Sequence, residues 1–70
     1  MNDTIEITVN GEPRTVAPEL TVDGLLDALD LPRERIAVEV NRRIVRRADW
    51  PTVRIAGGDR LEIVHFVGGG

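Results

Sequence analysis

Polar and apolar residues alternate near the start of the chain, over residues 4–10. The apolar positions of this segment are Ile5, Ile7 and Val9. A period of two predicts a β-strand with one buried face. The dipeptide Asn10-Gly11 tolerates the positive φ angles of a tight turn, and residues 14–16 then return as a second strand. The chain therefore opens with a predicted β-hairpin.

Between residues 22 and 29 the apolar spacing changes to three and four, which predicts an amphipathic helix. Its apolar face consists of Val22, Leu25, Leu26 and Leu29. Thr21 is suited to cap the first turn, and Pro32 prevents continuation. The opposite face carries Asp23, Asp27 and Asp30. We interpret this acidic stripe as solvated, and we expect one short helix.

The remaining apolar segments predict further strands. Residues 36–41 form a third strand, and residues 44–45 form a short fourth strand after a turn. The segment through Trp50 is predicted to be irregular, with the indole filling one end of the core. Residues 61–67 form the last predicted strand.

The order of the elements is a hairpin, one helix and then more strands, within a single domain of residues 1–70. This order is typical of an α+β fold with one helix on one face of a mixed sheet. If the first and last strands pair in parallel, the helix supplies the right-handed crossover between them. We therefore predict a β-grasp fold of four to five strands, with a flexible tail at residues 67–70.

Alternation along the last predicted strand separates two faces. The positions predicted to face the helix are Leu61, Ile63, His65 and Val67. We interpret His65 as a partly covered structural residue. Val64 and Phe66 fall on the open face, where they form a docking surface or are ordinary scattered surface apolar residues.

The composition fits a small folded domain. The chain has 70 residues, 41% hydrophobic and 30% charged, with a formal net charge of −3. No apolar run approaches the 18 or so residues of a membrane span, and residues 1–4 lack the start of a secretory signal. We expect a cytoplasmic protein with no membrane contact.

Several reactive side chains are missing. The sequence contains no Cys, Ser, Lys or Tyr, and its one imidazole is His65. Disulfides and thiolate metal sites are therefore excluded, and so is a persulfide held on a side chain. A domain of this size can hardly enclose a water-excluded pocket of several hundred Å3. We expect neither an enzyme acting alone nor a metal centre.

All nine basic residues are arginines, and four of them lie close together in the sequence. They are Arg42, Arg43, Arg46 and Arg47. Such a cluster binds carboxylates or phosphates, or it is simply a solvated surface. The negative net charge and the near absence of aromatic residues argue against a nucleic-acid partner.

Three glycines follow the last predicted strand, at Gly68, Gly69 and Gly70. Glycine lets a chain pass through a slot too narrow for other residues. We interpret this tail as a handle whose useful group is the terminal carboxylate, although a frayed chain end has the same appearance.

The sequence as a whole resembles the ThiS family, the ubiquitin-like sulfur carriers of thiamine biosynthesis. The segments that carry the resemblance are Ile7–Glu12, Thr21–Leu26, Val38–Val45, Arg47–Trp50, Gly58–Val64 and the glycine end. Their order and spacing together are more specific than any single piece. Gly69 and Gly70 match the pair that the family requires, and Gly68 extends the tail.

The resemblance implies a carrier rather than an enzyme. In that family a ThiF-like adenylyltransferase, related to ubiquitin-activating enzymes, uses ATP and Mg2+ to join AMP to the terminal carboxylate. Sulfur derived from cysteine then displaces AMP. The resemblance implies that Gly70 becomes a thiocarboxylate, and that Gly68 and Gly69 enter partner active sites. Delivery to thiazole synthase, a ThiG-like partner, follows.

In this interpretation Val64 and Phe66 contact the partners, and Arg42 and Arg43 add an electrostatic contact. The chain itself binds no cofactor. The missing cysteine agrees with sulfur carried on the backbone terminus.

Two related functions remain as alternatives. The small subunit of molybdopterin synthase shares the fold and the thiocarboxylate, but its first strand runs on without an early Asn-Gly turn. A ubiquitin-like protein modifier would instead be joined to target lysines through Gly70.

Overall fold

The computed structural model describes residues 3–66, and the elements follow the predicted order. They are β1 (Ile5–Val9), β2 (Glu12–Val16), α1 (Val22–Ala28), β3 (Ile36–Val40), β4 (Arg43–Val45), the 3-10 helix η1 (Arg47–Asp49) and β5 (Arg60–His65). The predicted tail at residues 67–70, and the inward orientation of Val67, lie outside the described residues. Neither helix within residues 3–66 is long and apolar enough to cross a membrane.

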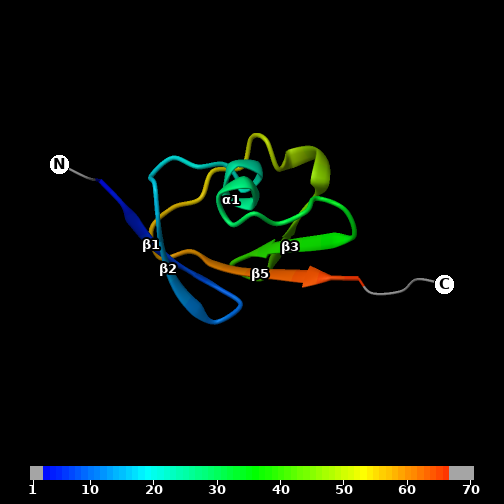
Figure 1. The fold of residues 1–70 in the computed structure, drawn as a ribbon, viewed down its shortest axis with the longest axis horizontal. Helices are drawn as coiled ribbons and strands as arrows, with labels where there is room; N and C mark the ends of the chain where they lie inside the picture. Colours follow the sequence, from blue (N-terminus) through cyan, green and yellow to red (C-terminus); the bar gives the residue numbers. More distant parts are fainter. Residues whose placement is uncertain (1–2, 67–70) are drawn as a thin grey trace.

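The five strands form one mixed sheet in the order β2-β1-β5-β3-β4. β1 and β5 pair in parallel, whereas the other neighbouring strands pair antiparallel. Figure 1 shows α1 lying on one side of this sheet. The predicted β-grasp fold, with one helix on one face, is confirmed.

The hairpin is longer than predicted. The two turn residues, Asn10 and Gly11, have φ angles of 52° and 83°, and the chain reverses directly after them. Glu12 therefore already stands opposite Val9, and Pro13 lies within β2 opposite Thr8. A proline is tolerated there because β2 is an edge strand of the sheet.

A single core lies between the sheet and α1. Its fully buried large side chains are Leu25, Leu26, Leu61, Val22 and Val38. Trp50 is 3% exposed, and its Nε1 donates a hydrogen bond of 2.9 Å to the Val45 carbonyl. The prediction that Trp50 belongs to the core is confirmed. The segment before it, predicted to be irregular, forms η1.

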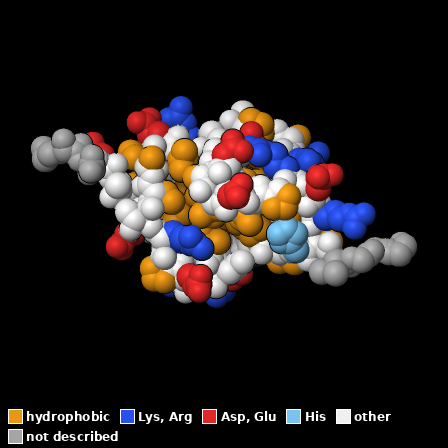
Figure 2. All heavy atoms as spheres, viewed as in Figure 1, with side chains coloured by type: hydrophobic (Ala, Val, Ile, Leu, Met, Phe, Trp, Pro, Cys, Tyr) orange, Lys and Arg blue, Asp and Glu red, His pale blue; other side chains and the backbone are white. Residues whose placement is uncertain are grey.

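Contrary to the prediction, His65 is exposed rather than partly covered. It forms the last pair of the β3–β5 ladder, opposite Ile36. The seven residues of α1 span about 10 Å, whereas the six of β5 span about 20 Å, so the helix is too short to cover the whole strand. Figure 2 shows the imidazole at the molecular surface.

The acidic stripe on α1 is also not simply solvated. Arg33 Nε donates to Asp23 Oδ1, Nη1 donates to Asp27 Oδ1 at 2.8 Å, and Nη2 donates to the Asp23 carbonyl at 2.9 Å. One guanidinium thus fastens the segment after α1 to the first two turns of the helix. Its hydrogen bond and its charge hold the pKa of Asp27 below the ordinary value.

Replacing Arg33 with glutamine is expected to lower stability at neutral pH. Because the pKa of Asp27 is lowered in the folded state, the ionised carboxylate stabilises the fold, and this stabilisation is fully present above the ordinary pKa of about 3.9. It is lost as pH falls through the depressed value. Urea unfolding of the unmodified protein and of Arg33→Gln from pH 7 to pH 2 measures the difference in their free energies of unfolding. We expect this difference to become smaller at acid pH.

The matched control is Arg54→Gln, because Arg54 pairs with Glu19 at 3.3 Å with both side chains largely exposed. Its unfolding midpoint is expected to stay close to that of the unmodified protein at every pH. A gap between Arg33→Gln and the unmodified protein that stays constant to pH 2 would contradict the assigned role of Asp27.

Candidate functional site

The sheet face opposite α1 carries exposed apolar side chains. The exposed fractions are 72% for Ile44, 50% for Val64 and 59% for Phe66, and these three residues are called the apolar patch. Val64 stands opposite Ala37 in the β3–β5 ladder. Ile44 lies on β4, one strand further, so it is about 10 Å from β5 across the sheet. Ile44 thus shares one face with Val64 and Phe66, which lie far from it in the sequence.

The outward orientation predicted for Val64 and Phe66 agrees with their exposure. Their role in docking stays a prediction. Ile44 was not predicted, although the sequence held a usable signal. Val45 packs against the core, and alternation along β4 then turns Ile44 to the opposite face.

Two carboxylates interrupt the apolar patch. Glu39 on β3 stands directly opposite Glu62 on β5, and Ile44 stands opposite Glu39 on the other side. Like charges directly across a ladder lower the stability of a sheet. The middle of this face is therefore negative, and a partner that covers it must supply polar or basic groups there.

The predicted arginine cluster borders Ile44. Arg42 lies in the β3–β4 turn with a φ of 70°, and Arg43 begins β4. All four arginines of the cluster are exposed, and none forms an ion pair with another described residue. The guanidinium of Arg47 lies 5.5 Å from the ring centroid of Trp50, a distance typical of a cation–π contact. The cluster is thus available for contacts with an acidic partner surface.

β5 connects the apolar patch to the glycine tail. Its end is fixed by a hydrogen bond of 2.7 Å from the Phe66 N–H to the Arg35 carbonyl. Phe66 is the last described residue, and Gly68, Gly69 and Gly70 lie outside the described residues. At about 3.3 Å per residue, four extended residues reach roughly 13 Å beyond Phe66.

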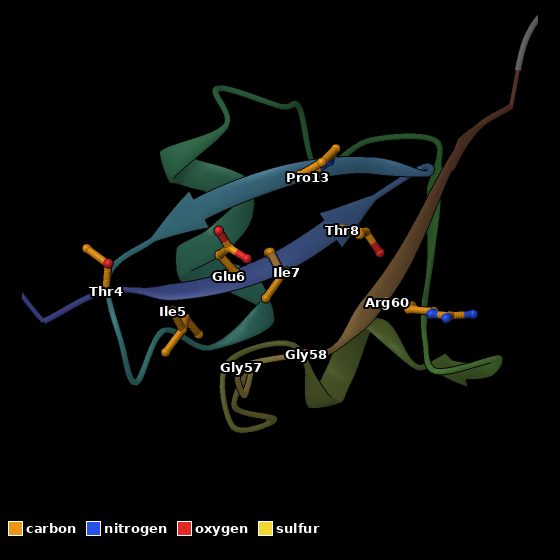
Figure 3. A pocket seen from close by; sticks show the side chains of 9 residues that line it. All are labelled: Thr4, Ile5, Glu6, Ile7, Thr8, Pro13, Gly57, Gly58 and Arg60. Atoms are coloured by element: carbon orange, nitrogen blue, oxygen red, sulfur yellow. The ribbon is translucent and has the colours of Figure 1, made fainter.

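A hollow of about 640 Å3 occupies another part of the molecule. Figure 3 shows β1 between Pro13 of β2 on one side and Gly57 and Gly58 on the other. Arg60 and Glu6 are its charged lining residues, and both are exposed. The hollow is therefore an open depression rather than a water-excluded pocket. Sequence reasoning did not predict it, and its residues include no member of the apolar patch.

No group of three or more carboxylate or imidazole side chains within residues 3–66 is arranged to hold a metal ion. The described surface combines the apolar patch, a border of exposed arginines and the strand β5.

Comparison with known proteins identifies the family. The model of the ThiS family matches residues 7–70, which is most of the chain. The chain belongs to the ThiS family. A crystal structure of the thiamine biosynthesis protein ThiS from Geobacter metallireducens is 38% identical, covers 94% of this chain and all of that one, and has a TM-score of 0.84.

Two curated relatives of this ThiS family member extend the comparison. The sulfur carrier protein ThiS of Bacillus subtilis is 38% identical over 50 residues, which are 71% of this chain and 76% of that protein. A thiazole synthase of Paramagnetospirillum magneticum is 39% identical over 66 residues, which are 94% of this chain. This chain spans only 20% of the length of that thiazole synthase.

Proposed function

We propose that this chain is a sulfur carrier of thiamine biosynthesis, and that it carries sulfur on the carboxylate of Gly70. The observation that carries the proposal is the family match over residues 7–70, which includes the glycine pair. The chemistry of the chain is compatible with this role, because it has no cysteine to hold sulfur elsewhere. The chain acts as a co-substrate of partner enzymes and not as an enzyme.

The terminal carboxylate must be activated before it can accept sulfur. Its ordinary pKa of about 3.3 to 3.7 makes it an anion at neutral pH, and an anion is a poor acyl electrophile. A ThiF-like partner joins the carboxylate to AMP with ATP and Mg2+, and pyrophosphate leaves. A hydrosulfide equivalent derived from cysteine then attacks the acyl carbon and loses its proton, the bond between the acyl carbon and AMP breaks, and Gly70 becomes a thiocarboxylate.

Delivery of the sulfur requires a second partner. We propose that this partner is a thiazole synthase, which agrees with the similarity of this chain to a segment of a protein of that name. The thiocarboxylate of Gly70 is the sulfur nucleophile, and Gly68 and Gly69 carry it into the active site. Glycine at these positions lets the tail pass between close walls without a Cβ clash.

Docking on the open face holds the carrier during both reactions. Val64 and Phe66 supply the apolar contacts that Ile44 extends, because exposed apolar side chains gain most from being covered. Arg42 and Arg43 at the border attract an acidic partner surface and favour one orientation. The partners supply the catalysis.

Intact-mass analysis tests this function. The full chain is incubated with the activating enzyme, ATP, Mg2+ and a sulfur source, and its intact mass is measured. Fragmentation in the mass spectrometer then shows whether a change in mass is located at Gly70. We expect an oxygen-for-sulfur exchange confined to Gly70. The control is a chain that lacks Gly69 and Gly70 and so has no terminal glycine pair, which should keep its mass. An unchanged mass of the full chain under verified enzyme activity would overturn the proposal.

The identity of the receiving enzyme is tested separately by recovery from a lysate of the source organism. Thiazole synthase is the expected protein. Recovery of the large subunit of molybdopterin synthase in its place would contradict the assignment to thiamine biosynthesis.

A further inference from the structure

The side chain of Asn10 bridges from the first hairpin to the last strand. Its Nδ2 donates a hydrogen bond of 3.1 Å to the Ile63 carbonyl, and its Oδ1 accepts one of 2.8 Å from the Ile63 N–H. Both bonds are partly buried and join residues 53 positions apart. One carboxamide therefore satisfies both backbone groups of Ile63 on that side of β5.

These two bonds continue a ladder that the backbone cannot continue. The parallel β1–β5 pairing joins Thr8 to Arg60 and Val9 to Leu61, and the Asn10 N–H adds a bond of 2.8 Å to the Leu61 carbonyl. The chain then reverses into the hairpin at Asn10, so β1 has no backbone left to pair with the rest of β5. The carboxamide occupies the place where the next backbone amide of a longer β1 would bond.

On its β1 side, the second half of β5 is held by this contact with Asn10. From Ile63 of β5 to Phe66, the chain is held on the β3 side by the antiparallel ladder and by the bond from the Phe66 N–H to the Arg35 carbonyl. On the β1 side, the carboxamide of Asn10 makes the only hydrogen bonds to these four residues found within residues 3–66. Val64 of the apolar patch lies within this half, and Phe66 follows directly after its end.

We propose that Asn10 is a positioning residue for partner docking, because its carboxamide fixes the half of β5 that carries Val64 and leads to Phe66. Asn10 acts through β5 and touches neither a partner nor the reacting group. The role of Asn10 in partner docking rests on the proposed carrier function, whereas its effect on the order of β5 is independent of that function. Loss of the carboxamide frees β5 to move on the β1 side, and the docking residues must then be ordered again on binding.

A second asparagine provides a matched control. Asn41 also lies in a hairpin turn, at a φ of 53° against 52° for Asn10. Its Oδ1 accepts a hydrogen bond of 2.9 Å from the Arg60 N–H, and its Nδ2 donates one of 3.0 Å to Asp59 Oδ1. Asn41 thus bonds to the beginning of β5, away from Val64 and Phe66.

The experiment compares Asn10→Gly with Asn41→Gly. Glycine accepts the positive φ at both positions, so each variant loses a carboxamide without backbone strain. Amide hydrogen exchange at Ile63 should become about thirtyfold faster in Asn10→Gly, since two net hydrogen bonds of this kind correspond to roughly that factor. Asn41→Gly should leave exchange at Ile63 nearly unchanged.

Kinetics with the activating enzyme test the consequence for docking. In Asn10→Gly the KM for the carrier should rise about tenfold and kcat should stay within about twofold, because bound carrier still presents the same tail. Asn41→Gly should change KM by less than about twofold. Equal exchange at Ile63 in both variants, or equal KM values, would overturn the proposal. If the unmodified chain is not adenylated at all, the carrier role fails, and hydrogen exchange alone still decides whether Asn10 holds β5.

Discussion

Replacing Leu25 with alanine is expected to lower the free energy of unfolding by about 3 kcal/mol, within the range of 2 to 5 measured for buried leucines. Leu25 lies on α1 with no exposed surface and is one of the largest fully buried side chains. Alanine would leave a cavity between the helix and the sheet. A domain of this size has roughly 5 kcal/mol of stability, so most of it would be lost.

Urea unfolding followed by the fluorescence of Trp50 measures this change, because the indole is buried in the same core. The matched control is Ile44→Ala, an aliphatic truncation of a side chain that is 72% exposed. Its effect should stay within about 0.5 kcal/mol. A loss below 1 kcal/mol for Leu25→Ala would show that the core does not pack as described.

Replacing Phe66 with alanine is expected to weaken binding to the activating partner by about thirtyfold, which corresponds to the 2 kcal/mol of a docking anchor. Phe66 is 59% exposed, so its truncation should leave the unfolding midpoint almost unchanged. The prediction therefore separates binding from folding. Isothermal titration of the partner with each variant measures the affinity.

Thr15→Ala serves as the control for this titration. Thr15 is exposed and stands opposite Glu6, at the edge of the sheet farthest from β4. Its replacement should change the affinity by less than twofold. Equal affinities for Phe66→Ala and the unmodified chain would remove Phe66 from the docking surface, without affecting the proposal for Gly70.

These experiments test three parts of the carrier separately, namely the core, the open face of the sheet and the terminal carboxylate. The core must be stable, the open face must be recognised, and the terminal carboxylate must react. The small domain needs no catalytic pocket of its own under this scheme, since ATP and the acyl adenylate are handled by the partner. The position of β5 links these parts, because Leu61 and Ile63 are core residues while Val64 and Phe66 are exposed.

The sequence by itself determined the local structure. Alternation predicted β1, the Asn10-Gly11 dipeptide predicted the turn, and the spacing of leucines after Thr21 predicted α1. The observed cap confirms that start, because the Gly24 N–H donates a hydrogen bond of 3.0 Å to Thr21 Oγ1. These features depend on residues within about four positions of one another, so the local sequence is sufficient to predict them.

The carrier chemistry assigned to Gly70 also came from the sequence, through the absence of cysteine, serine, lysine and tyrosine and the resemblance to the ThiS family. It remains a proposal. The structure adds the strand that leads toward this group and the exposed residues beside it.

Only the tertiary structure decided which distant residues meet. The register of β3 with β4 and β5 brings Ile44 onto the same face as Val64, and the length of α1 leaves His65 exposed. The carboxamide of Asn10 reaches Ile63 because the parallel pairing of β1 with β5 ends beside it. Such contacts depend on the register of the strands and on the lengths of the elements across the whole domain. A local pattern of residues predicts neither the register nor these lengths.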